Sequence, residues 1–167
     1  MPDAPETFLV FCRPNGGRVK ITAPVLQLLR AYAQHGPKDT EAGGVMMGRY
    51  LQGSDDVVVD AATEPMRGDR RSRYSFYRDK TRHQAVLDAA WKTSGGTCTY
   101  LGEWHTHPEA DPTPSGIDTH DWRRRLWTDK YDDELFFVIV GTAIIRNWSG
   151  KGEYLGSHPL ALLASSL

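Results

Sequence analysis

Short hydrophobic runs bounded by turn residues dominate the first half of the chain and indicate β-strands. Runs rich in Val, Ile, Phe and Tyr fit a pleated surface, and Gly, Pro, Asn and Asp mark their ends. The runs FLVFC and RVKI flank the turn sequence PNGG and are expected to pair. A second hairpin is expected over residues 43–61. The strands predicted in this way are residues 8–12, 18–21, 45–51, 57–61, 74–77, 99–105, 135–141, 143–148 and 153–155.

Helical spacing of apolar residues predicts three longer helices. Leu26, Leu29 and Tyr32 recur at this spacing, after Pro24 in the opening turn, and the helix should end near Gly36. The second helix is expected from Arg78 to Lys92 and the third from Ser115 to Thr128. A short helix is expected after Pro159. In the second helix the residues expected to face the core are Ala85, Val86, Ala89 and Ala90.

The order of elements and the length favour one domain. The chain has 167 residues, with 40% hydrophobic and 25% charged residues, which is ordinary for a globular protein. Strands and helices alternate, so we expect a single domain over residues 1–167 with its core at about 8–155. Its fold class should be α/β or α+β, with one mixed β-sheet flanked by helices.

Charge and hydropathy exclude several classes of function. The formal net charge of −1 gives no reason to expect nucleic-acid binding. No apolar run approaches the roughly 20 residues of a membrane-spanning helix, so no membrane partner is expected. Cys12 and Cys98 lie far apart in strand-like sequence, which favours reduced thiols in a cytoplasmic protein.

An arginine-rich stretch, EPMRGDRRSR at residues 64–73, has no apolar periodicity and is expected to be an exposed loop. Two interpretations of it stay open. It is either a solvated flexible loop or a basic flap that grips an acidic partner or an extended tail.

Candidate metal-ligating and catalytic residues are concentrated in the stretch GEWHTHPEADPTPSGIDTHDW, residues 102–122. His105 and His107 are two apart, so on a strand both side chains point to one face. Ser115 and Asp118 have the spacing of a helix N-cap with its partner. Taken alone, these pairs could be a polar pair and a capping box. Together, two histidines, a carboxylate and an open position match a catalytic zinc site.

A hydrolytic zinc site also needs a carboxylate outside the metal's coordination sphere to accept and pass on a proton. Glu41, Glu64 and Glu103 are candidates, and spacing alone does not decide among them. His120, two residues after Asp118 on the same helix, should point away from the metal.

The residues of this stretch, together with an upstream glutamate segment, resemble those of a known family. His105-Thr106-His107-Pro108, a spacer and Ser115-Gly116-Ile117-Asp118 look like the JAMM motif of the JAB1/MPN/Mov34 metalloproteases. The segment EAGGVMMG at residues 41–48 resembles the family's glutamate-bearing segment. The resemblance implies a cytidine-deaminase-like fold and a zinc-dependent peptidase or isopeptidase. His105, His107 and Asp118 would bind zinc, Glu41 would be the general base, and Ser115 would donate a hydrogen bond to the oxyanion.

The resemblance also implies a substrate. Family members cleave the bond after the C-terminal glycine of a ubiquitin-like protein, and the hairpin edge at Val45, Met46 and Met47 could receive the extended tail. The chain is similar to stand-alone prokaryotic members, which favours a deconjugating peptidase of CBASS anti-phage operons acting on a conjugated nucleotidyltransferase, the CD-NTase, through its C-terminus. Alternatives are a trimming peptidase for a sulfur-carrier protein and a non-catalytic MPN scaffold.

Overall fold

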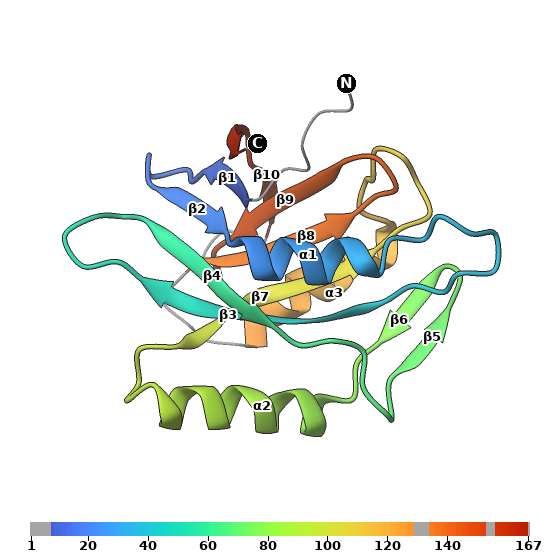
Figure 1. Ribbon diagram of the computed structural model, residues 1–167, viewed down its shortest axis with the longest axis horizontal. Helices are drawn as coiled ribbons and strands as arrows, with labels where there is room; N and C mark the ends of the chain where they lie inside the picture. Colours follow the sequence, from blue (N-terminus) through green and yellow to red (C-terminus); the bar gives the residue numbers. More distant parts are fainter. Residues whose placement is uncertain (1–7, 129–133, 153–155, 167) are drawn as a thin grey trace.

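The computed structural model describes residues 8–128, 134–152 and 156–166. A curled nine-stranded sheet, in the order β10-β9-β8-β7-β3-β4-β2-β1-β11, forms its centre (Figure 1). The pairs β2–β4 and β7–β8 are parallel and the other neighbours are antiparallel. The sheet is therefore mixed, as predicted. Its strands are β1 (Phe8–Cys12), β2 (Arg18–Ile21), β3 (Gly43–Tyr50), β4 (Val57–Ala62), β7 (Thr99–Thr106), β8 (Leu135–Val140), β9 (Ile145–Gly150), β10 (Ser157–Pro159) and β11 (Leu162–Ser166).

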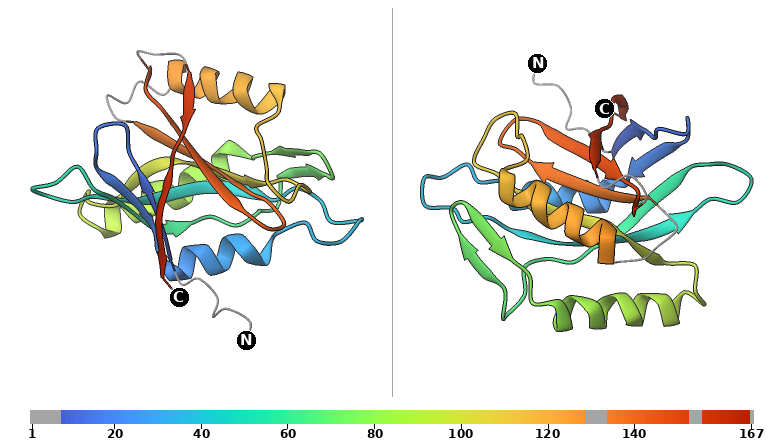
Figure 2. Two further views of the ribbon diagram at one scale, coloured as in Figure 1. Left: turned by 90° about the horizontal axis from the view of Figure 1, so that it is seen from above. Right: turned by 180° about the vertical axis from the view of Figure 1, so that it is seen from behind.

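Three helices cover the sheet: α1 (Ala23–Ala31), α2 (Lys80–Thr93) and α3 (Gly116–Thr128). Seen from above, α1 and α3 lie on opposite sides of the sheet (Figure 2). The helix α2 runs below β3 and β7 in Figure 1. A separate two-stranded hairpin, β5 (Arg70–Ser72) with β6 (Ser75–Tyr77), precedes α2. No helix in the described ranges is both long and apolar enough to cross a membrane.

The alternation of side chains along β8 explains why two cores form. This strand, LFFVIV, is buried at every position. Phe136, Val138 and Val140 pack with α1 residues on one face, whereas Phe137 and Ile139 pack with Trp122 of α3 on the other. A strand covered on both faces reads as a continuous hydrophobic run instead of an alternating one.

Two expectations about secondary structure and one about burial were wrong. Residues 70–72, expected to be part of a loop, form β5. The tail after Pro159, expected to be helical, forms β11 and pairs antiparallel with β1. Along α2, Ala85, Val86 and Ala89 are exposed, and the buried residue is His83. The strand expected at 153–155 lies outside the described residues.

Buried polar partners explain the burial of His83, which is 1% exposed. Its Nδ1 atom lies 2.6 Å from Thr63 Oγ1 and its Nε2 atom 3.0 Å from Asp69 Oδ2. The backbone N–H groups of Met66 and Asp79 donate to the same carboxylate. These hydrogen bonds tie the segment between β4 and α2 to the sheet, because Thr63 also accepts a hydrogen bond from the Val45 N–H of β3.

Candidate metal centre

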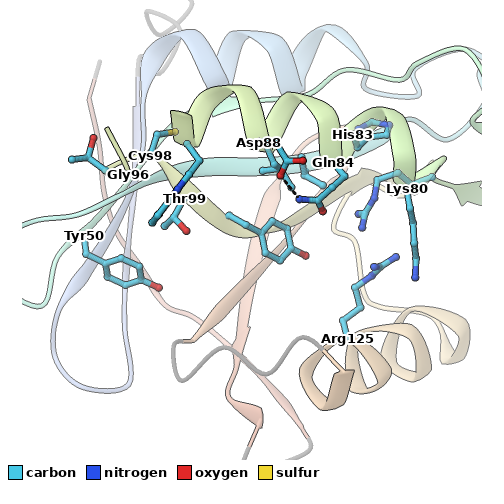
Figure 3. A pocket seen from close by; sticks show the side chains of 15 residues that line it. Tyr50, Lys80, His83, Gln84, Asp88, Gly96, Cys98, Thr99 and Arg125 are labelled. Atoms are coloured by element: carbon cyan, nitrogen blue, oxygen red, sulfur yellow. Dashed lines mark hydrogen bonds between the residues drawn. The ribbon is translucent and has the colours of Figure 1, made fainter. Parts of the chain in front are cut away.

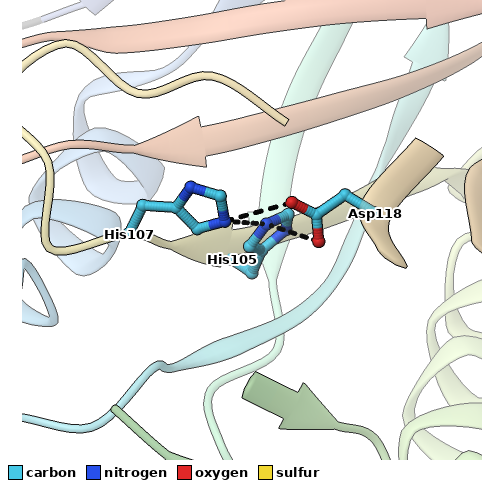
Figure 4. Close-up of side chains that lie close together, drawn as sticks. All are labelled: His105, His107 and Asp118. Atoms are coloured by element: carbon cyan, nitrogen blue, oxygen red, sulfur yellow. Dashed lines mark hydrogen bonds and ion pairs between the residues drawn. The ribbon is translucent and has the colours of Figure 1, made fainter. Parts of the chain in front are cut away.

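The end of β7 and the start of α3 bring three side chains together (Figure 4). His105 lies in β7, and His107 follows the last residue of that strand. Asp118 lies in the first turn of α3. Each offers one ligand atom, and these atoms lie within 4.8 Å of one another. The structure therefore joins the residues that the sequence assigned to a metal.

The distances within this group fit a metal ion. His105 Nε2 and His107 Nε2 are 3.1 Å apart, and Asp118 places Oδ1 at 3.3 Å from His105 Nε2 and Oδ2 at 3.1 Å from His107 Nε2. Ligands at about 2.0–2.1 Å from a tetrahedral zinc ion are about 3.3 Å apart. Two imidazole nitrogens and a carboxylate at such distances form a donor set that suits zinc.

Neighbouring groups orient the side chains of His107 and Asp118. His107 Nδ1 lies 2.9 Å from Glu109 Oε1, which leaves its Nε2 lone pair for a metal, as in many carboxylate–histidine–metal arrangements. Asp118 and Ser115 form a reciprocal cap: Ser115 N–H donates to Asp118 Oδ2 at 2.7 Å, and Asp118 N–H donates to Ser115 Oγ at 3.1 Å. Glu109 was not among the residues predicted from the sequence, although its position two residues after His107 was the available signal.

The electrostatics of the group favour a cation. Burial alone raises the pKa of Asp118, but hydrogen bonds from His105 and His107 outweigh it and hold this pKa far below its usual range. Burial alone lowers the pKa of His107, but Asp118, Glu41 and Glu109 raise it above its ordinary value. The negative charges around His107 stabilise positive charge at this point, whether a proton or a metal ion carries it.

Of the candidate bases, the structure brings Glu41 to the metal group. Glu41 Oε1 lies 3.8 Å from His107 Nε2, and the side chain is 7% exposed. Burial raises the pKa of Glu41 to about 7, although His105 and His107 oppose this shift. Glu64 instead accepts a hydrogen bond from the Tyr32 hydroxyl at 3.0 Å, and Glu103 pairs with Arg78 and Arg125.

The expected tail-binding edge at Val45, Met46 and Met47 is not available. These residues are 1%, 0% and 3% exposed, and β3 pairs with β4 on one side and β7 on the other. The expectation of a free edge here was wrong because a hairpin strand becomes internal when a third strand joins it. The backbone of Thr63 passes close to Gly44, since a Cβ atom at Gly44 would lie 2.2 Å from the Thr63 carbonyl oxygen.

A groove of about 740 Å³ lies between α2 and α3, over β3 and β7 (Figure 3). Lys80 and Arg125 line one end, and Tyr50 and Gly96 lie at the other. Arg78 and Arg125, which line the groove, both pair with Glu103, two residues before His105 on β7. One end of the groove is thus close to the metal group along this strand.

Fold and site together define a small mixed-sheet protein with a two-histidine, one-aspartate group that could bind a metal ion. Its family is the prokaryotic homologs of the JAB domain: the family model matches residues 22–150, and the chain belongs to this family. The predicted family and fold class are thereby confirmed. The solution structure of protein DSY2949 from Desulfitobacterium hafniense has a similar fold, with a TM-score of 0.57, 23% identity and coverage of 83% of this chain and 87% of that chain.

Curated relatives carry names of hydrolases. The "CD-NTase/cGAS isopeptidase" of Vibrio cholerae is 39% identical over 145 residues, 87% of this chain and 88% of that protein. The protein of the same name from Pseudomonas aeruginosa is 42% identical over 116 residues, 70% of this chain and 72% of that protein. The "Probable metalloprotease y4qB" of Sinorhizobium fredii is 36% identical over 75 residues, 43% of each chain. These relationships confirm the predicted hydrolase class and support the predicted isopeptidase activity.

Proposed function

We propose that this protein is a zinc-dependent isopeptidase that releases a CD-NTase from the lysine side chain to which its C-terminus has been joined. The observation that carries the proposal is the placement of a buried carboxylate, Glu41, within 3.8 Å of His107 in a His105–His107–Asp118 group. Names of relatives that match most of this chain support the substrate class. Such a substrate would be met in the bacterial cytoplasm.

His105, His107 and Asp118 would hold the zinc ion. Zinc, when bound, supplies a Lewis acid and lowers the pKa of a coordinated water to about 7. The Nδ1 contact of His107 with Glu109 keeps the ring oriented. Asp118 is oriented in turn by the cap with Ser115. A donor set that is positioned by its neighbours needs little rearrangement to accept the ion.

Glu41 would carry the proton during hydrolysis. Its Oε1 atom would accept a proton from the attacking water and later donate it to the leaving lysine nitrogen. In the metal-free protein burial raises the pKa of Glu41 to about 7, and the charge of a bound zinc ion would lower it, which suits a carboxylate that must first accept a proton. Ser115 Oγ accepts the Asp118 N–H, so its own hydroxyl hydrogen is available to the developing oxyanion.

The test uses a CD-NTase joined through its C-terminus to a lysine of a test peptide. We expect about one zinc per chain and loss of cleavage on chelation. Changing Glu41→Ala should lower kcat by roughly a hundred- to ten-thousand-fold, the range for general acid–base catalysis, while zinc stays bound. The matched control is Glu64→Gln, which removes a carboxylate outside the site and should cleave normally.

Two outcomes would overturn this proposal. The first is a protein without zinc whose cleavage survives chelation. The second is a Glu41→Ala variant with full activity. Cleavage of a sulfur-carrier fusion in preference to the CD-NTase conjugate would keep the chemistry and replace the substrate with the alternative.

A further inference from the structure

Two arginines of the arginine-rich segment at residues 64–73 donate hydrogen bonds to backbone carbonyls of residues 36–41. Arg73 Nη1 donates to the Gly36 carbonyl at 3.0 Å. Arg71 Nε donates to the Glu41 carbonyl at 2.7 Å, and Arg71 Nη2 lies 3.4 Å from the Thr40 carbonyl. The Arg71 guanidinium also lies over the Tyr32 ring, 6.0 Å from its centroid. These contacts differ from those of a free loop, because they hold residues 36–41.

Both backbone groups of Glu41 are bound by β5. Its carbonyl accepts from Arg71, and its N–H donates to the Ser72 carbonyl at 2.7 Å. The next residue, Ala42, is bound from the opposite direction by Thr106, which lies between the two histidine ligands. Ala42 N–H donates to Thr106 Oγ1 at 3.0 Å, and Thr106 N–H donates to the Ala42 carbonyl at 2.9 Å. The backbone at 41–42 is therefore fixed between β5 and the metal-binding end of β7.

We propose that Arg71 is a positioning residue for Glu41, holding the backbone from which that carboxylate reaches the metal group. This inference rests on the proposed role of Glu41 as general base. A base must lie within hydrogen-bond reach of the proton it takes, and a displacement of about 1 Å can lower the rate by about 100-fold. An arginine suits this task because its guanidinium keeps its charge and offers several donors in a fixed plane.

The kinetic test compares Arg71→Gln, Arg71→Lys and Arg67→Gln on the zinc-loaded protein with the CD-NTase–lysine conjugate. Arg71→Gln should lower kcat about 10- to 100-fold and leave KM within about two-fold. Arg71→Lys, which keeps a charged donor, should recover part of the loss. Arg67→Gln is the matched control: Arg67 is exposed in the same segment, and its change removes the same charge without touching residues 36–41, so activity should be unchanged.

A second readout uses the metal-free protein and needs no substrate. Amide hydrogen exchange should become faster at Glu41 and Ala42 in Arg71→Gln, while the amides of β8 keep their wild-type rates. Zinc affinity should be unchanged, because Arg71 does not contact the three ligands. A loss of stability throughout the protein would instead accelerate exchange in β8 as well.

The two readouts separate this inference from the proposed function. If the wild type cleaves nothing while exchange at 41–42 rises in Arg71→Gln, the isopeptidase fails and the backbone contact stands. Unchanged exchange at 41–42, or an unchanged kcat, would overturn the positioning role. An equal rise of KM in Arg71→Gln and Arg67→Gln would also overturn it, in favour of a flap that binds an acidic partner by its charge.

Discussion

Thr106 lies between His105 and His107, the two proposed histidine ligands, and its hydroxyl group offers a test of what holds this site together. The residue is fully buried, and its Oγ1 atom accepts the Ala42 N–H and donates to Gln34 Oε1 at 2.8 Å. The Gln34 amide, itself 2% exposed, donates to the carbonyls of Asp39 and Arg73. One hydroxyl thus links the segment after α1, the residue before β3 and the end of β7.

Changing Thr106→Val keeps the shape and removes the hydroxyl. Two buried groups then lose their partners, the Ala42 N–H and Gln34 Oε1. At about 1–3 kcal/mol for each such group, the free energy of unfolding should fall by about 2–6 kcal/mol. Thr106→Ser keeps the hydroxyl and loses one methyl, at a cost of about 1 kcal/mol. For a chain of this length each kcal/mol corresponds to about 2–4 °C in Tm.

The assay is urea unfolding of the metal-free wild type and both variants in the presence of a chelator. Chelation matters because metal binding would add its own stabilisation to whichever variant bound metal better. Thr106→Val should unfold at lower urea than Thr106→Ser. A fully buried position would favour valine if apolar burial decided the outcome. Equal or greater stability of Thr106→Val would therefore refute the hydrogen-bond argument.

Two further predictions concern buried charges. Burial raises the pKa of Asp69, but N–H donors and His83 outweigh this effect and lower the pKa below its ordinary value. The resulting stabilisation is present above about pH 4 and is lost as the pH falls through the folded-state pKa. The urea midpoint of Asp69→Asn should therefore depend less on pH in this acid range than that of the wild type, and equal slopes would contradict this. Arg13 and Glu134, each 9% exposed, pair at 2.9 Å. Arg13→Met should lower the free energy of unfolding by about 3–5 kcal/mol, because it leaves the buried Glu134 carboxylate without its partner. The double variant with Glu134→Leu should recover most of this loss in the same assay, and a double variant as unstable as Arg13→Met would contradict this reasoning.

Sequence patterns predicted the sheet well where the pattern is set by local chemistry. The turn PNGG and the runs on either side sufficed for the β1–β2 hairpin. Patterns failed where partners distant in sequence decide the structure. The tail ALLASSL contains good helix formers, yet pairing with β1 makes residues 162–166 a strand, because tertiary contacts override weak propensity.

The helix α2 shows a second limit of predicting structure from sequence patterns. Alanine is compatible with either face of a helix, so Ala85 and Ala89 gave little information about which side is buried. The residue that is buried, His83, is polar, and it is accommodated because Thr63 and Asp69 contact both ring nitrogens. Neither partner lies on the helix, so the sequence of α2 alone contains no signal for this burial.

The three candidate metal ligands and the candidate base also differ in how far they could be predicted from the sequence. His105, His107 and Asp118 lie within a short stretch, and strand and helix periodicity were enough to predict their convergence. Glu41 joins them through the register of β3 on β7, in which Gly43 lies opposite His105. Register between distant strands cannot be derived from spacing, which is why the residues alone left three glutamates open until the family resemblance singled one out.

The two interpretations of Ser115 and Asp118, a capping box and a metal ligand, turn out to be compatible. Asp118 Oδ2 accepts the Ser115 N–H at 2.7 Å and lies 3.1 Å from His107 Nε2. The cap therefore orients the carboxylate that faces the histidines. A rate loss in Ser115→Ala would combine loss of the cap, about 1 kcal/mol, with loss of the hydroxyl donor. Glycine caps a helix within a few tenths of a kcal/mol of serine, so the loss measured in Ser115→Gly isolates the oxyanion contribution.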